Sequence, residues 1–122
     1  QYNTYDEIAI RKQKDFDAEM TKALKFINTD YFGIEVDLDA IPNIPSSAMT
    51  LSGFSIEQLR QFVHFFGKNK NATYLHICEG APDLGEEKNN QLVGKLIGYL
   101  VTDFMKANDP TERIINNMIV QF

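Results

Sequence analysis

Two aspartates separated by one residue are the side chains of this sequence best suited to bind a metal ion. Asp37 and Asp39 lie in the run EVDLDAIP, at the end of a segment whose alternating hydrophobic residues indicate a β-strand. Side chains two positions apart on a strand project from the same face, so the two carboxylates are expected side by side. Because neighbouring carboxylates repel unless a cation neutralises them, the spacing fits half of a site for a hard divalent ion. It equally fits a strand with a solvated acidic edge and no ligand.

A third carboxylate, Glu79, follows a second strand-like segment in the run HICEGAP. Open α/β sheets bind their ligands at the carboxyl ends of the strands. If the two strands are neighbours, Glu79 lies on the same rim as Asp37 and Asp39. There it could hold a cationic group through charge-assisted hydrogen bonds. The alternative is an ordinary exposed glutamate at a strand end.

The two histidines and the single cysteine carry weaker signals. His64 lies in the middle of a helical pattern and is expected on the helix surface or against the sheet. His76 precedes Glu79 by three residues, so its ring is expected on the opposite face, packed within the layer. Cys78 is expected to be a small buried hydrophobic residue, because no basic partner lies at a suggestive spacing. We therefore assign no catalytic residue within the chain.

Helical patterns alternate with the two strand patterns. The expected elements are a helix over 14–27, a strand over 31–39, an irregular loop over 41–54, a helix over 55–67, a strand over 73–79 and a helix over 86–107. Ser55 and Gln58 form a capping-box pattern at the start of the second helix. The first twelve residues are expected to be irregular or extended, and the segment after 107 stays unassigned.

This order of elements indicates an α/β fold with a parallel sheet, because strands joined through helices pair in parallel by right-handed crossovers. Two strands alone make a poor sheet. The hydrophobic bands of the helices are also broad, so further strands and helices are expected alongside. The chain begins with Gln1 rather than methionine, which leads us to expect a segment of a longer protein.

Composition limits the partners and the location of the protein. The 122 residues are enough for one domain, and a net charge of −5 with a pI near 4.9 argues against nucleic-acid binding. No signal peptide and no long apolar run is present, so the protein is expected to be soluble and cytoplasmic, without a membrane partner. The single cysteine excludes an internal disulfide framework and fits a reducing compartment.

Three segments together resemble one enzyme family. YFGIEVDLDAIP is similar to the Ser-x-Asp-x-Asp-x-x-Asp-Pro segment of the arginase, agmatinase and formiminoglutamase superfamily, the ureohydrolases. YLHICEGAP resembles the final core strand of that family, and QLVGKLIGYLVTDFMK resembles the helix that follows it. The order and separation of the three segments also agree, so the resemblance covers about residues 30–107.

The resemblance implies a fold and an activity. The fold would be a three-layer α/β/α arrangement with a parallel sheet, of which residues 1–122 form a C-terminal segment with about two core strands and three helices. Members of the family use a pair of Mn²⁺ ions to activate a water that cleaves a C–N bond in a linear amidine such as arginine or formiminoglutamate. Asp37 and Asp39 would be metal ligands, and Glu79 would bind the cationic head of the substrate.

The sequence departs from the family pattern at two positions and lacks two motifs. Glu35 stands where serine is usual, and Pro42 stands where the third aspartate would fall. The ending HICEGAP favours a divergent, formiminoglutamase-like branch. The Gly-Gly-Gly-His and Asp-Ala-His-x-Asp segments that supply the other ligands do not occur. We therefore expect the chain alone to be inactive, to bind Mn²⁺ weakly and to need the rest of its domain upstream of Gln1.

A different class of function fits the same residues. A non-catalytic α/β binding or assembly module would use the acidic rim to solubilise the sheet edge or to grip a basic partner. The departures at Glu35 and Pro42 keep this alternative open. The exact substrate and assembly into a homo-oligomer are also left open by the sequence.

Overall fold

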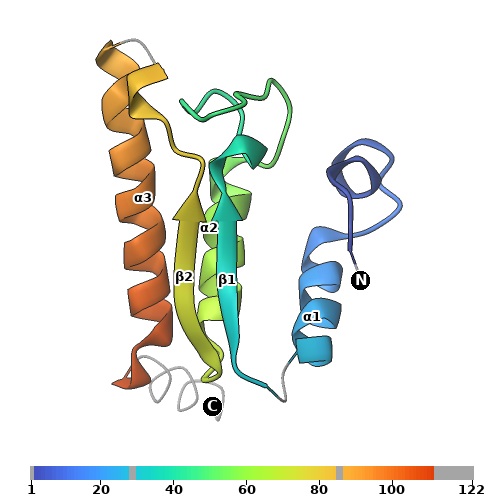
Figure 1. The fold of residues 1–122 in the computed structure, drawn as a ribbon. Coiled ribbons are helices and arrows are strands. Elements are labelled where there is room, and N and C mark those ends of the chain that lie inside the picture. The colour runs from blue at the N-terminus through green and yellow to red at the C-terminus, as the bar shows by residue number, and fades with distance from the viewer. Residues whose placement is uncertain (1, 28–29, 85–86, 112–122) are drawn as a thin grey trace.

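The structure is a computed structural model that describes residues 2–27, 30–84 and 87–111. Two strands, β1 (Phe32–Asp37) and β2 (Ala72–Cys78), pair in parallel. Three α-helices accompany them: α1 (Phe16–Ile27), α2 (Ile56–Gly67) and α3 (Glu87–Asn108) (Figure 1). The α/β class and the parallel pairing predicted from the sequence are confirmed.

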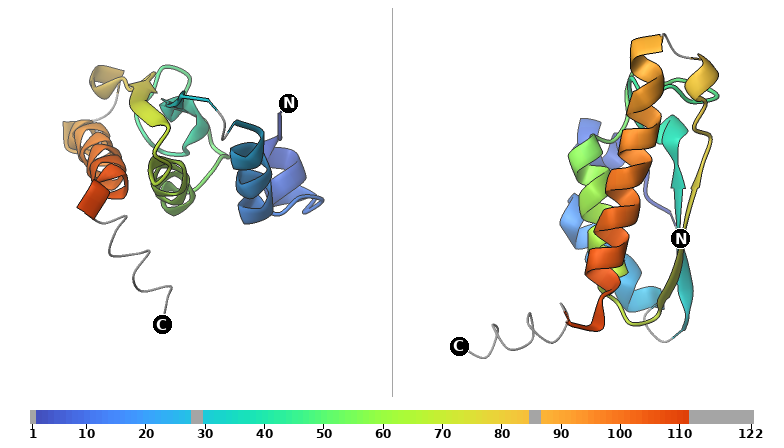
Figure 2. Two further views of the ribbon diagram at one scale, coloured as in Figure 1. Left: turned by 90° about the horizontal axis from the view of Figure 1, so that it is seen from below. Right: turned by 90° about the vertical axis from the view of Figure 1, so that its left-hand side faces the viewer.

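The three helices lie on one side of the sheet (Figure 2). The described residues thus form two layers, and they leave the other face of the strands exposed. Among these residues, no helix is both long and apolar enough to cross a membrane.

Alternation along β1 explains which face is covered. Ile34 and Val36 are buried on the side of α2 and α3, whereas Glu35 between them is exposed. The core beneath the sheet is closed by Val63 of α2 and Leu100 of α3, both fully buried. At the surface, Arg60 of α2 donates two hydrogen bonds to Asp103 of α3, at 2.6 and 3.0 Å, so the two helices are joined by both apolar and ionic contacts.

The helix boundaries follow from local capping. The predicted capping box is confirmed, because the Ser55 hydroxyl accepts from the Gln58 backbone N–H at 3.1 Å and Gln58 Oε1 accepts from the Ser55 N–H at 3.0 Å. This cap starts α2 directly after the long loop. It therefore fixes where the loop over 41–54 ends.

Both strands end earlier than the sequence predicted. β1 stops at Asp37, and residues Leu38–Ala40 form a 3₁₀ turn (η2). The Asp37 carboxylate caps this turn by accepting a hydrogen bond from the Asp39 backbone N–H at 2.8 Å. β2 stops at Cys78, because Glu79 adopts the left-handed backbone conformation with a φ of 65°. The prediction that Asp39 and Glu79 belong to strands was thus wrong, since a side-chain cap and a left-handed residue end the two strands first.

The first residues are also more regular than predicted. Asp6–Ile10 form a π-helical turn (η1), so the expectation of an irregular or extended segment was wrong there. Glu7 holds the turn, because its carboxylate accepts from the backbone N–H and the hydroxyl of Thr4, both at 3.0 Å, and from Lys14 at 2.9 Å. Such reciprocal side-chain caps leave little hydrophobic periodicity in the sequence. Of the unassigned end, residues 112–122 lie outside the described part.

Candidate functional site

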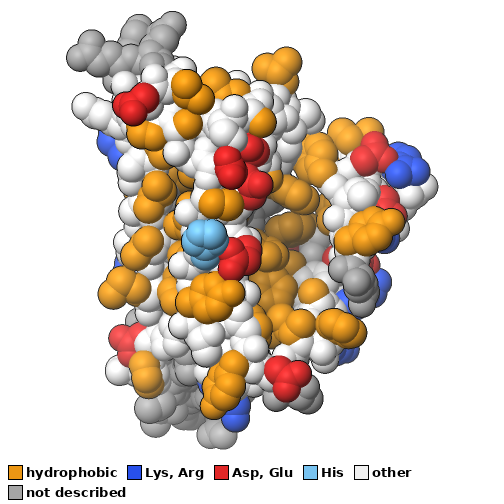
Figure 3. All heavy atoms as spheres, in the orientation of Figure 1, with side chains coloured by type: hydrophobic (Ala, Val, Ile, Leu, Met, Phe, Trp, Pro, Cys, Tyr) orange, Lys and Arg blue, Asp and Glu red, His pale blue; other side chains and the backbone are white. Residues whose placement is uncertain are grey.

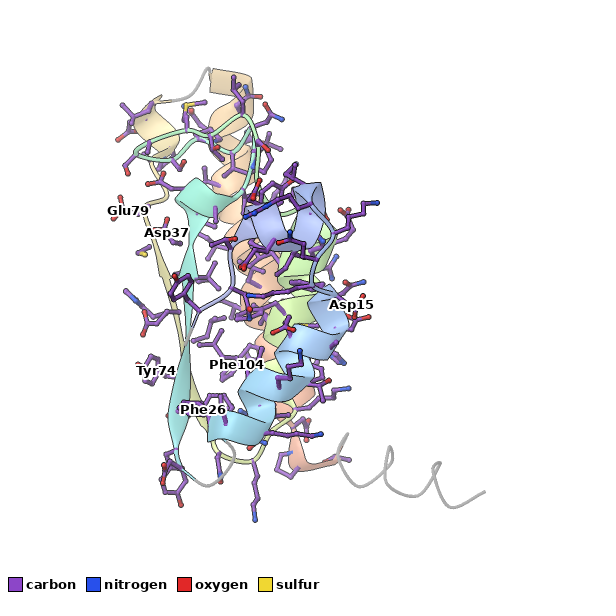
Figure 4. All side chains as sticks on the ribbon, turned by 90° about the vertical axis from the view of Figure 1, so that its right-hand side faces the viewer. Asp15, Phe26, Asp37, Tyr74, Glu79 and Phe104 are labelled. Carbon is purple, nitrogen blue, oxygen red and sulfur yellow. The ribbon has the colours of Figure 1, made fainter. Side chains whose placement is uncertain are left out.

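The three predicted carboxylates come to the same end of the sheet. Asp37 ends β1, Asp39 lies in η2, and Glu79 follows β2 directly. In the register of the sheet Asp37 lies opposite Cys78, the residue before Glu79. Figure 4 shows Asp37 and Glu79 near each other at the upper end of the two strands. The strands are therefore neighbours, as the prediction of a shared rim required.

A serine that sequence reasoning missed joins two of these carboxylates. The Ser47 hydroxyl oxygen lies 2.9 Å from Asp39 Oδ2 and 2.5 Å from Glu79 Oε2. Because a hydroxyl carries one proton, it can donate to only one of the two oxygens at a time. The other contact then brings an oxygen lone pair against a negative charge. A shared proton or a bound cation would relieve this repulsion.

The loop that carries Ser47 is fixed to the end of β2 by its backbone. The Ser47 N–H donates to the Glu79 carbonyl at 3.0 Å, and the Ala81 N–H donates to the Pro45 carbonyl at 3.0 Å. Ser46 and Gly80 form an antiparallel bridge between these two bonds. The left-handed conformation of Glu79 turns the chain so that this pairing is reached. Ser47 is thus placed by main-chain contacts, and only the density of serines and prolines in the loop hinted at a role.

Asp39 lies in an environment that favours its ionised form. The Ala48 backbone N–H donates to Asp39 Oδ1 at 2.8 Å and is the main reason that the pKa of Asp39 lies below its usual value. The hydroxyls of Ser46 and Ser47 lower this pKa further, and desolvation opposes them. Ser46 is fully buried, and its hydroxyl has no hydrogen bond of regular geometry among the described residues. A polar atom with unused capacity therefore lies beside the Asp39 carboxylate.

The negative charge of this rim affects the thiol of Cys78. Burial raises the pKa of its thiol above the ordinary value, and the charges of Asp37 and Glu79 raise it further. The thiol lies 3.6 Å from the Val36 carbonyl oxygen, to which it donates a weak hydrogen bond. A protonated, half-buried thiol is a poor nucleophile. Cys78 is therefore only half-buried, where the sequence predicted a buried residue, and its raised thiol pKa disfavours a nucleophilic role.

His76 differs from its prediction. It does not pack within a layer but is exposed on the open face of the sheet, where its Nδ1 contacts Glu35 Oε2. The Glu35 carboxylate has a pKa below its usual value because of His76 and, next, the hydroxyl of Tyr74. Figure 3 shows histidine, acidic and hydrophobic side chains together on this face. The prediction placed His76 by counting alternate residues back from Glu79. That count fails because Glu79, with its left-handed backbone, does not continue the strand. His64 is exposed on α2, as one of its two predicted positions required.

The rim offers oxygen donors that fit part of a manganese site. Carboxylates and hydroxyls are hard ligands, which Mn²⁺ and Mg²⁺ prefer. Hard divalent ions take about six ligands, however. Within the described residues, no three His, Cys, Asp or Glu side chains converge closely enough to hold a metal ion. Asp37 and Asp39 could thus supply one side of such a site, which needs further ligands to be complete.

Comparison with known proteins adds no family to these observations: no protein-family model and no curated protein sequence matched the chain.

Proposed function

We propose that this chain forms the C-terminal part of a manganese-dependent hydrolase that cleaves a C–N bond of a linear amidine, such as a guanidino or formimino compound. The proposal is supported by the position of Asp37, Asp39 and Glu79 at the adjacent carboxyl ends of two parallel strands. The resemblance of the surrounding sequence to the ureohydrolases supplies the reaction class.

The Ser47 contact is the single observation that carries the proposal. One hydroxyl proton is shared between two carboxylate oxygens at 2.9 and 2.5 Å, so the pair Asp39 and Glu79 has an excess of negative charge. The low pKa of Asp39 means that this excess is not removed by protonation of Asp39 near neutral pH. A metal ion on one side and a cationic substrate on the other would neutralise both carboxylates.

Each residue then has a distinct role. Asp37 and Asp39 would hold metal, and Glu79 would bind the amidinium group of the substrate through charge-assisted hydrogen bonds. Ser47 would position the Glu79 carboxylate. Bound Mn²⁺ supplies Lewis acidity that makes water nucleophilic near neutral pH. The described residues do not complete the metal site, so the chain alone is expected to be inactive.

The test uses the protein encoded by the complete gene, purified with Mn²⁺ and assayed on arginine, agmatine and formiminoglutamate. We expect the double variant D37N/D39N to lose bound manganese and to lower turnover by more than about 100-fold. Glu79→Gln should keep the metal and raise KM, because it removes only the charge that faces the substrate. Metal content is measured by emission spectrometry, and product release by ammonia or urea detection.

Asp83→Asn serves as the matched control, because Asp83 is an exposed carboxylate of the neighbouring turn η3 (Pro82–Leu84). It should retain both manganese and turnover. Unchanged metal content and turnover in D37N/D39N would contradict the proposal. A complete protein that neither binds manganese nor hydrolyses any amidine would favour the non-catalytic binding or assembly module instead.

A further inference from the structure

A hollow lies between the N-terminal segment and the sheet, away from the Glu79 side of the rim. Its volume is about 440 Å³, within the range of sites that bind small organic molecules. Helix α1 and η1 form one wall, and β1 with α2 forms the other (Figure 3). The carboxylates at the strand ends do not account for this hollow.

Aromatic rings dominate the walls of this hollow. Phe16 and Phe54 line one side with ring centroids 5.8 Å apart, and Phe62 and Phe66 of α2 line the other with centroids 4.8 Å apart. The faces of aromatic rings carry partial negative charge, so they attract cations as well as apolar groups. The walls therefore suit a ligand with an apolar body and a positive charge.

The charged residues of the hollow have a single sign. Glu19, Glu35 and Asp37 line it, and no Lys, Arg or His is among its described lining residues. Glu19 is only 7% exposed, and its ion-pair partner Lys22 lies at the surface with 63% of its side chain exposed. A carboxylate held in a largely apolar wall is costly to desolvate, which a cationic ligand would offset. An anionic ligand would meet repulsion from the Glu19 carboxylate.

We propose that this hollow is a binding site for organic ammonium ions with an aromatic or branched apolar body. The rings bind the body, and Glu19 binds the charged end. The site does not rest on the proposed hydrolase activity, because Glu79 and Ser47 are not among its lining residues, although Asp37 borders both sites.

The experiment compares three probes of similar shape on the chain: benzylammonium, neutral benzyl alcohol and anionic benzoate. Binding is followed by amide chemical-shift changes in NMR spectra, which also locate each probe. We expect benzylammonium to bind about 10-fold more tightly than benzyl alcohol, with shifts at Phe16, Met20 and Leu59, and benzoate not to bind. All three residues line the hollow.

Two variants separate charge from shape. Glu19→Gln should weaken benzylammonium binding about threefold or more, whereas Asp17→Asn, an exposed position of the same helix, should not change it. Ala23→Leu should fill the hollow and abolish binding.

Three results would overturn the proposal. One is equal affinity for benzylammonium and benzyl alcohol. Another is shifts confined to Asp39, Ser47 and Glu79, which would assign the ammonium ion to the strand-end site. A third is a dimer in light scattering that is lost in Ala23→Leu, which would mean that a second copy of the chain fills the hollow.

Discussion

The tyrosine on the neighbouring strand leaves room for no residue other than glycine at position 33. A Cβ at this position would lie 2.0 Å from the Tyr74 ring, whose hydroxyl is hydrogen-bonded to Glu35. The ring therefore covers Gly33 and reaches the residue two positions further along β1. Because Gly33 has no side chain, the Tyr74 ring can cross β1 and contact Glu35 on the open face of the sheet.

The change Gly33→Ala should push the Tyr74 ring away and break its contact with Glu35. The pKa of Tyr74 is raised above its ordinary value by that hydrogen bond, so in the variant it should fall back toward that value. NMR titration of the tyrosine ring resonances measures the change. Gly94→Ala, where nothing lies within 4 Å of the added methyl, is the control and should leave the Tyr74 pKa alone. An unchanged Tyr74 pKa in Gly33→Ala would contradict this account.

Single residues of the rim were predictable only where the chain is regular. The positions of Asp37 and Glu79 at neighbouring strand ends follow from hydrophobic alternation and from the parallel pairing that α/β order requires. Ser47 was not predictable, because its place depends on main-chain bonds between a loop and the turn after β2. His76 was placed on the wrong side because a left-handed glutamate gives no reliable sequence signal.

At the scale of elements, η1 is held by one carboxylate. Three donors converge on Glu7 and lower its pKa to about 2, the largest contribution coming from the Thr4 backbone N–H and the next from Lys14. In the unfolded chain the same group titrates near 4.5. A lowered carboxyl pKa means that the contribution of Glu7 to stability is present above pH 4.5 and is lost as the pH falls toward 2.

We expect η1 to loosen reversibly between about pH 4.5 and pH 2. Hydrogen exchange or amide chemical shifts at Thr4 and Ile8 follow the transition. Glu7→Gln should show the loosened state already at pH 7, whereas Asp17→Asn should titrate like the original chain. A protection of η1 that does not change down to pH 2 would refute the role of Glu7.

The elements with strong periodicity or caps were the predictable ones. The helix over 14–27 was found as α1 at Phe16–Ile27, and the long last helix was found as α3 at Glu87–Asn108. The ends of β1 and β2 moved because side-chain caps and backbone conformation act over one or two residues. Such short-range effects do not alter the hydrophobic pattern from which strands are predicted.

For the whole molecule, stability depends on the contact of α3 with the sheet and α2. Leu100 has no exposed surface, and truncating such a side chain removes its burial energy and leaves a cavity. Leu100→Ala should therefore lower the free energy of unfolding by about 3 kcal/mol. Leu92→Ala on the same helix is the control, because Leu92 is 39% exposed and its loss should cost less than about 1 kcal/mol. Denaturant titration followed by circular dichroism compares the two, and equal losses would contradict this view of the core.

The arrangement of α1 was beyond sequence reasoning. Its amphipathic pattern predicts a buried face, but not that this face meets Phe54 of the loop and Phe62 of α2 across a hollow. That arrangement depends on how α1, the loop and α2 pack together. Local sequence patterns define each of these elements but not their packing. The sequence therefore led to the carboxylates of the rim and not to the aromatic walls beside them.

The left-handed backbone conformation of Glu79 lowers the stability of the fold. A residue with a Cβ in the left-handed conformation gives up about 1 kcal/mol relative to glycine, which adopts it freely. The next residue is Gly80, which could adopt the left-handed conformation without this energetic cost if the turn were placed one residue later. The chain instead keeps a charged side chain in a left-handed backbone conformation. Replacing Glu79 with glycine is thus expected to stabilise the protein while removing the carboxylate that Ser47 contacts.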